Sequence, residues 1–134
     1  MALGSTAAVA TLLIAGLGAA MSVRGEVRDE DECLRMHPEI VSPVEMATCT
    51  YDLEGSRQRL TTTYARLQRL VAPGDLPLLE RAQEAWLSYR DAECRYRGGA
   101  SRNTISGSYF VACTADMNRA RAVELEDGSE RWAR

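Results

Sequence analysis

The sequence contains no lysine and a single histidine among its 134 residues. Without lysine, the glycine pair at 98–99 cannot form a phosphate-binding loop, which needs spaced glycines followed by a lysine. With His37 alone, neither a histidine-assisted nucleophile nor a histidine-rich zinc site is expected. All sixteen basic residues are arginine, no basic block stands out and the net charge is −3. Nucleic acid is therefore a poor candidate partner.

Long hydrophobic runs are also scarce. The main one, "AAVATLLIAGLGAAM" at 7–21, falls short of the roughly 20 residues that span a bilayer, so a membrane anchor is the second choice. Small residues follow the run, and cleavage after Ala20 or Gly25 would suit a secretory signal peptide over 1–25, although no arginine precedes the run. The first cysteine, Cys33, lies beyond this zone, so no lipid anchor is expected. We predict an exported chain, periplasmic or secreted, without a stable membrane anchor after cleavage.

The chain has four cysteines, Cys33, Cys49, Cys94 and Cys113. An even number behind an export signal predicts two disulfides. The closely spaced pairs that hold zinc are missing, so neither a metal nor another cofactor is expected. Sequence gaps of 16 and 19 positions favour the pairs Cys33–Cys49 and Cys94–Cys113. A Cys49–Cys94 bridge stays open as the competing arrangement, because these two positions would be adjacent in an antiparallel helix pair.

Three amphipathic segments follow an acidic lead-in at 26–41, which we expect to be extended or loosely helical. Ser42, Pro43 and Glu45 form a capping box that starts a helix over about 43–71. A second helix should run from Asp75 to the glycines at 98–99, and a third from about 110 to 128. The pattern predicts an all-α domain over 42–127: a small antiparallel three-helix bundle stapled by two disulfides, with a flexible tail at 128–134.

The stretch "QEAWLSYRDAEC" at 83–94 concentrates aromatic and charged residues on one predicted helix. Trp86, Tyr89 and Arg90 are residue types found at binding hot spots, but aromatic residues at helical spacing usually face a core. We therefore assign these three residues to the structural core. Leu60 and Tyr64 of the first helix belong to the same predicted core.

The same stretch resembles the Q-x-x-W-x-x-Y-R-D-x-x-C signature of the lysozyme inhibitor LprI-like domain. Further matches are "LTTTY" at 60–64, where Thr61 replaces an asparagine, and "GGAS" at 98–101, where Ala100 is inserted. Cys113, Arg121 and Leu125 fit the C…R…L ending of the family. The resemblance covers about residues 33–125 and implies a small exported, disulfide-bearing helical domain that inhibits lysozyme. The founding inhibitor is lipid-anchored, and this chain lacks the cysteine for that.

An enzyme is the least favoured class, because the cysteines are expected to be oxidised and His37 has no catalytic partner. Glu80 and Glu84 lie one helical turn apart, which is typical of a solvated face. The expected function is inhibition of a cationic lysozyme by protein–protein binding. The alternative is a structural or assembly module of the cell envelope that inhibits nothing.

The candidate partner-binding residues lie in and beside the glycine-rich loop at 98–108. They are Arg102, Ser106, Ser108 and Tyr109. A lysozyme cleft carries two carboxyl groups, so an inhibitor needs hydrogen-bond donors on a rigid loop. Acidic residues in 26–32 should speed the encounter with a basic enzyme, an effect that salt would weaken.

Overall fold

The computed structural model describes residues 27–99, 103 and 105–132, and every regular element within them is helical. The all-α prediction is confirmed, but these residues form five helices, so the prediction of a three-helix bundle is wrong. The helices are α1 (Glu30–Met36), α2 (Pro43–Thr50), α3 (Leu53–Leu70), α4 (Leu76–Gly99) and α5 (Ser106–Trp132). The signal peptide expected at 1–25 lies outside the described residues. Within the described range, no helix is both long and apolar enough to cross a bilayer.

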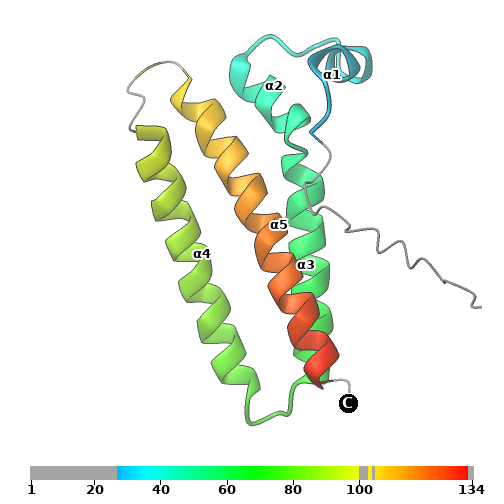
Figure 1. Ribbon diagram of the computed structural model, residues 1–134, viewed down its shortest axis with the longest axis vertical. Coiled ribbons are helices and arrows are strands. Elements are labelled where there is room, and N and C mark those ends of the chain that lie inside the picture. The colour runs from blue at the N-terminus through cyan, green and yellow to red at the C-terminus, as the bar shows by residue number, and fades with distance from the viewer. Residues whose placement is uncertain (1–26, 100–102, 104, 133–134) are drawn as a thin grey trace, which may run out of the picture.

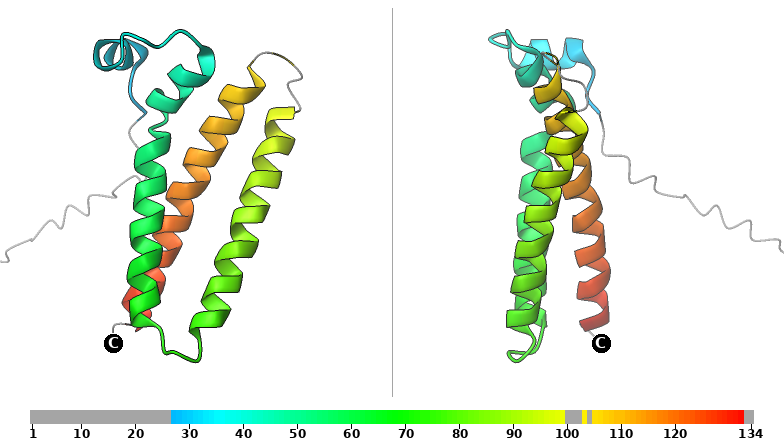
Figure 2. Two further views of the ribbon diagram at one scale, coloured as in Figure 1. Left: turned by 180° about the vertical axis from the view of Figure 1, so that it is seen from behind. Right: turned by 90° about the vertical axis from the view of Figure 1, so that its left-hand side faces the viewer.

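The three long helices form the body of the molecule, and α5 is the helix that holds it together. It packs against α2, α3 and α4, and Figures 1 and 2 show that α4 is antiparallel to both α3 and α5. Leu60, Leu67 and Leu125 form one buried cluster between α3 and α5. Partly buried side chains pack against this cluster, namely Tyr64, Val71, Leu79 and Trp86. Burial, and secondarily the charge of Glu80, raise the pKa of the Tyr64 phenol.

The helix predicted over 43–71 is interrupted at Asp52, which has a left-handed backbone with φ of 46°. Aspartate tolerates this conformation better than most residues. The Asp52 side chain then caps α3 by accepting a hydrogen bond from the Gly55 amide at 3.3 Å. A β-carbon at position 55 would overlap the Asp52 carboxylate, so a glycine that looked like a helix weakness leaves room for the cap. Two helices therefore replace the single predicted one.

The start of α2 is the capping box that the sequence predicts. The Ser42 hydroxyl accepts from the Glu45 amide, and the Glu45 carboxylate accepts from the amides of Val41 and Ser42. The hydrogen bonds that the Glu45 carboxylate accepts, first from the Val41 amide and then from the Ser42 hydroxyl and amide, lower the pKa of Glu45. The cap therefore contributes most above the ordinary glutamate pKa of 4.5 and is lost as the pH falls through the lowered value.

The C-terminal end of α5 contradicts the predicted flexible tail, because the helix continues through Gly128 to Trp132. Gly128 faces Leu67 of α3, where an added β-carbon would lie 3.5 Å from Cδ2. Ser129 is buried in the next turn, and its hydroxyl donates to the Leu125 carbonyl at 2.9 Å. Packing against α3 thus outweighs the low helix propensity of glycine.

Substitution of Asp52 should separate its two roles. Asp52→Ala removes the cap and leaves a β-carbon in the left-handed region without the polar side chain that helps aspartate to adopt it, so the free energy of unfolding should fall by about 2 kcal/mol. Asp52→Gly removes the cap but adopts the left-handed backbone without strain, and should lose about half as much. Urea denaturation of the two variants measures the difference, and equal losses would show that the left-handed turn is unimportant.

Candidate protein-binding surface

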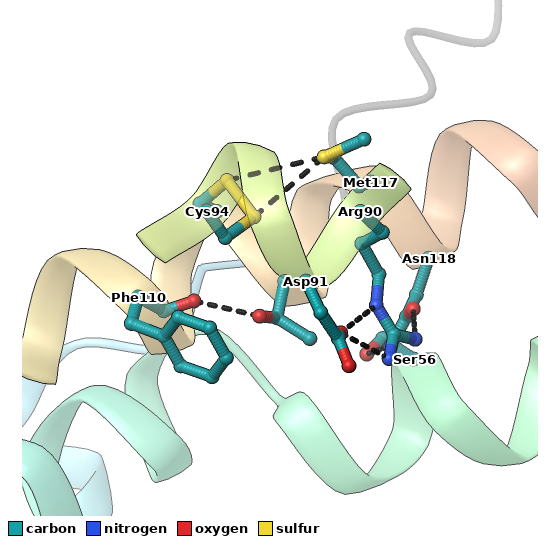
Figure 3. Close-up of polar contacts among 9 residues, drawn as sticks. Ser56, Arg90, Asp91, Cys94, Phe110, Met117 and Asn118 are labelled. Atoms are coloured by element: carbon teal, nitrogen blue, oxygen red, sulfur yellow. Dashed lines mark hydrogen bonds and ion pairs between the residues drawn. A yellow bond between two sulfur atoms is a disulfide. The ribbon is translucent and has the colours of Figure 1, made fainter. Parts of the chain in front are cut away.

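A chain of hydrogen bonds crosses the bundle at Arg90. The Arg90 Nη1 of α4 donates to Asn118 Oδ1 of α5 at 2.8 Å, and Asn118 Nδ2 donates to Ser56 Oγ of α3 at 3.1 Å (Figure 3). Asn118 is fully buried, and such a side chain is costly to bury unless its polar atoms are paired. The three long helices are therefore fixed relative to one another by one polar chain.

Neighbouring residues of the 83–94 stretch complete this structural unit. Arg90 Nε and Nη2 both donate to Asp91 Oδ1, at 2.9 and 2.7 Å. The guanidinium groups of Arg90 and Arg121 lie over the Trp86 ring, 5.6 and 5.7 Å from its centroid. Arg121 Nε also donates to the buried Gln83 side chain at 3.2 Å. Most of this stretch thus organises the bundle.

Tyr89 is the exception, and its assignment to the core is wrong. Its side chain is 56% exposed, whereas Gln83 and Cys94 on the same helix are buried. The reason lies in the helical spacing: Tyr89 is three positions from Trp86, but it falls on the far side of Trp86 from Gln83 and Arg90, which face α5. A tyrosine on the open surface of α4 is free to contact another molecule.

Two disulfides bind the helices at one end of the molecule. They join Cys33 to Cys49 between α1 and α2, and Cys94 to Cys113 between α4 and α5, the pairing that the sequence gaps favour. Figure 1 places α1, α2, the C-terminal end of α4 and the start of α5 at one end of the molecule, opposite the turn between α3 and α4, and the last two helix ends form the α4–α5 junction. We call α1, α2 and this junction the disulfide end. No free cysteine remains for nucleophilic or metal chemistry.

The candidate binding residues of the 98–108 region have different environments. Arg102 lies outside the described residues. Ser106 begins α5, and its hydroxyl donates to the Asn103 carbonyl at 2.8 Å. Ser108 Oγ is buried and has no hydrogen-bond partner among the described residues. Tyr109 is 52% exposed. Residues 106–108 therefore belong to the first turn of α5 rather than to a loop, and Tyr109 is the described candidate best placed to meet a partner.

The disulfide end also exposes large apolar side chains that the sequence reading did not connect. They are Leu34, Met36, Val41, Val44, Ile105 and Tyr109. Val44 of α2 comes next to α5 because Gly107 allows a close approach: a β-carbon at position 107 would lie 2.7 Å from Val44 Cγ2. The apolar residues around Cys33 could have indicated this exposed apolar surface in the sequence, but the acidic composition of the lead-in obscured them.

A cavity of about 360 Å³ opens at the same end, between the segment that connects α1 to α2, helix α2 and the start of α3. Four carboxylates surround it, those of Glu39, Glu45, Asp52 and Glu54. Asp52 is paired with Arg28 at 3.1 Å, and Ile40 and Cys49 contribute an apolar wall. This combination suits a lysine or arginine side chain, whose stem is apolar and whose end is cationic. Among the described residues no group of side chains has the composition of a metal site.

Comparison with known proteins identifies the family of this chain. A family model described as "Lysozyme inhibitor LprI" matches residues 33–125, well over half of the chain. The chain belongs to the LprI family. An uncharacterised protein of Rhizobium meliloti (strain 1021) is 36% identical over 55 residues, a match that covers 40% of this chain and 40% of that protein. No solved structure matches the chain.

The LprI match begins at Cys33 and ends at Leu125. It therefore includes both disulfides, the polar chain through Asn118 and the buried cluster between α3 and α5. The resemblance drawn from the 83–94 stretch is confirmed. Except for the exposed Tyr89, the 83–94 stretch forms part of the framework of this LprI domain.

Alanine substitutions at 86 and 89 should have contrasting effects on stability. Trp86→Ala removes a ring packed against the Leu60 cluster and two guanidinium groups, and we expect a loss of about 3 kcal/mol in the free energy of unfolding. Tyr89→Ala should change it by no more than about 0.5 kcal/mol, because the ring is exposed. Thermal and urea unfolding test both. An equally large loss for Tyr89→Ala would return that residue to the core.

Proposed function

We propose that the protein is an exported lysozyme inhibitor that binds its target enzyme through the disulfide end. The observation that carries this proposal is the LprI match over residues 33–125. Export is supported by the cysteines, all four of which are joined in disulfides, since such bonds persist in oxidising compartments. Inhibition requires no chemistry from this chain, because occupying the enzyme's cleft is sufficient.

The disulfide end has the physical features of a rigid binding surface. Its exposed apolar residues offer area to bury, and the two disulfides restrict the segments that carry them. A surface that is ordered before binding loses less conformational entropy in the complex. Tyr109, exposed at the start of α5, is the type of residue that dominates such interfaces.

The charge of this end suits a cationic enzyme. The first turn of α1 carries Glu30, Asp31 and Glu32, and the cavity beside α2 adds four further carboxylates. Opposite charges accelerate the encounter of two proteins, and a basic side chain of the enzyme fits the cavity. Arg102 would supply the opposite charge, a guanidinium that pairs with a carboxylate of the enzyme's cleft.

The proposal predicts that inhibition depends on Arg102 and Tyr109. Wild-type protein should slow the lysis of a peptidoglycan suspension by at least one of several lysozyme types. The double variant Arg102→Ala with Tyr109→Ala should bind more weakly by about 2–5 kcal/mol, because a charge-paired contact and an aromatic anchor are lost. Lysis rates at graded inhibitor concentrations measure the change.

The matched control is Arg81→Ala with Tyr89→Ala, which removes the same two residue types from the exposed side of α4. This variant should inhibit as wild type does. Full inhibition by the Arg102/Tyr109 variant would remove the disulfide end as the binding surface. Failure of the wild type against every lysozyme would favour the other function, a non-inhibitory module of the cell envelope.

A further inference from the structure

One side of α4 carries a continuous apolar stripe that no other part of the described chain covers. Its members are Leu78, Ala82, Ala85, Tyr89, Ala92 and Tyr96, all of them exposed. Leu78 and Tyr89 are each 56% exposed and Tyr96 is 75% exposed. We call these six residues the α4 outer face. Large apolar side chains grouped in this way mark interaction sites more often than singly scattered ones do.

The spacing of the α4 outer face is that of a helix–helix seam. Its six positions follow one another at intervals of four, three, four, three and four residues. This alternation keeps one line of side chains facing a partner helix, and the alanines permit a close approach. The side of α4 that packs on α5 is different and contains Gln83, Cys94 and Gly98, which are buried. Helix α4 thus has two packing seams: one packs on α5 within the bundle, and the other is the α4 outer face.

One edge of the α4 outer face is basic, although the whole chain has a net charge of −3, and the other edge carries Glu93. Arg81, Ser88 and Arg95 follow one edge at seven-residue intervals. Neither arginine forms an ion pair within the described part of the chain. Arg97 lies near the other edge, 60% exposed, and pairs with Glu93 at 2.7 Å. These charges favour an acidic partner.

A second copy of the chain fits this face poorly. In an antiparallel pair with matched seams, two-fold symmetry brings like edges together, so Arg81 would lie against Arg95 of the second copy. In a parallel pair, each position meets itself. Layers of tyrosine on tyrosine would then alternate with layers of alanine on alanine, which need different distances between the helices. Like charges oppose the first arrangement and side-chain size opposes the second.

We propose that the α4 outer face binds an acidic amphipathic helix of another protein, with the partner's apolar seam on the six residues and its carboxylates along Arg81 and Arg95. The face runs along α4 from Leu78, near the turn between α3 and α4, to Tyr96, two residues beyond the disulfide-bonded Cys94. Only its Tyr96 end therefore approaches the disulfide end. Such a protein would hold an enzyme at one end while its α4 attaches it to an envelope component.

Two synthetic helical peptides test the proposal with the full chain. Both carry a leucine and alanine heptad seam, and they differ only in having glutamate or lysine along the edges. Fluorescence anisotropy should show binding of the glutamate peptide and not of the lysine peptide. Tyr89→Glu should weaken binding at least about tenfold. Arg81→Glu with Arg95→Glu should reverse the preference between the two peptides.

Tyr109→Glu is the matched control, because it introduces the same change at an exposed tyrosine of the disulfide end. It should leave peptide binding unchanged, whatever its effect on lysozyme. Equal binding of both peptides, no binding of the glutamate peptide, or binding unaffected by Tyr89→Glu would overturn the proposal. So would sedimentation of the wild type as a dimer that Tyr89→Glu dissociates, since a second copy would then cover the face. Attachment to anionic vesicles in place of the peptide would assign the face to lipid and equally overturn it.

Discussion

The fully buried Asn118 is the constraint on which the arrangement of the long helices depends. Its amide is paired at both ends, with the Arg90 guanidinium of α4 and the Ser56 hydroxyl of α3. Any rotation or sliding of one helix would leave a polar atom unpaired inside the protein, at a cost of about 1–3 kcal/mol. Trp86, over which the same guanidinium lies, packs against the Leu60 cluster, so the orientation of α4 is set from the core. Which residues of α4 face outward follows from that orientation.

The disulfides stabilise a different part of the molecule, the disulfide end. The core of this small domain consists of two modest clusters, one around Leu60 and Leu125 and the other around Ala47 and Val111. A chain of this size often needs covalent links to order its periphery. The bridge from Cys33 to Cys49 attaches the short α1, which makes few other contacts, and the bridge from Cys94 to Cys113 fixes the junction of α4 and α5. Polar pairing thus orders the middle of the bundle, and disulfides order the end that we propose as the inhibitory surface.

The sequence predicts those features that depend on neighbouring residues. The helical class, the capping box at Ser42 and the end of α4 at its glycine pair all follow from local patterns. The break at Asp52 could not be read in this way, because distant groups stabilise it: Arg28 pairs with the Asp52 carboxylate, and Arg119 donates to the Tyr51 carbonyl. The length of α5 was missed because burial against α3 compensates for Gly128. Periodicity placed Trp86 and Tyr89 on one face, but could not tell which of two adjacent stripes the bundle covers. For the candidate site, residue type identified Tyr109, while the burial of Ser108 is a consequence of tertiary packing.

Hydrogen–deuterium exchange of the protein with and without an inhibited lysozyme would locate the inhibitory surface, because it reports the contact without substitutions. We expect slower exchange in α1, in α2 and at the start of α5, with no change at the turn between α3 and α4 or along the middle of α4. Protection along the α4 outer face, with none at the disulfide end, would contradict this expectation.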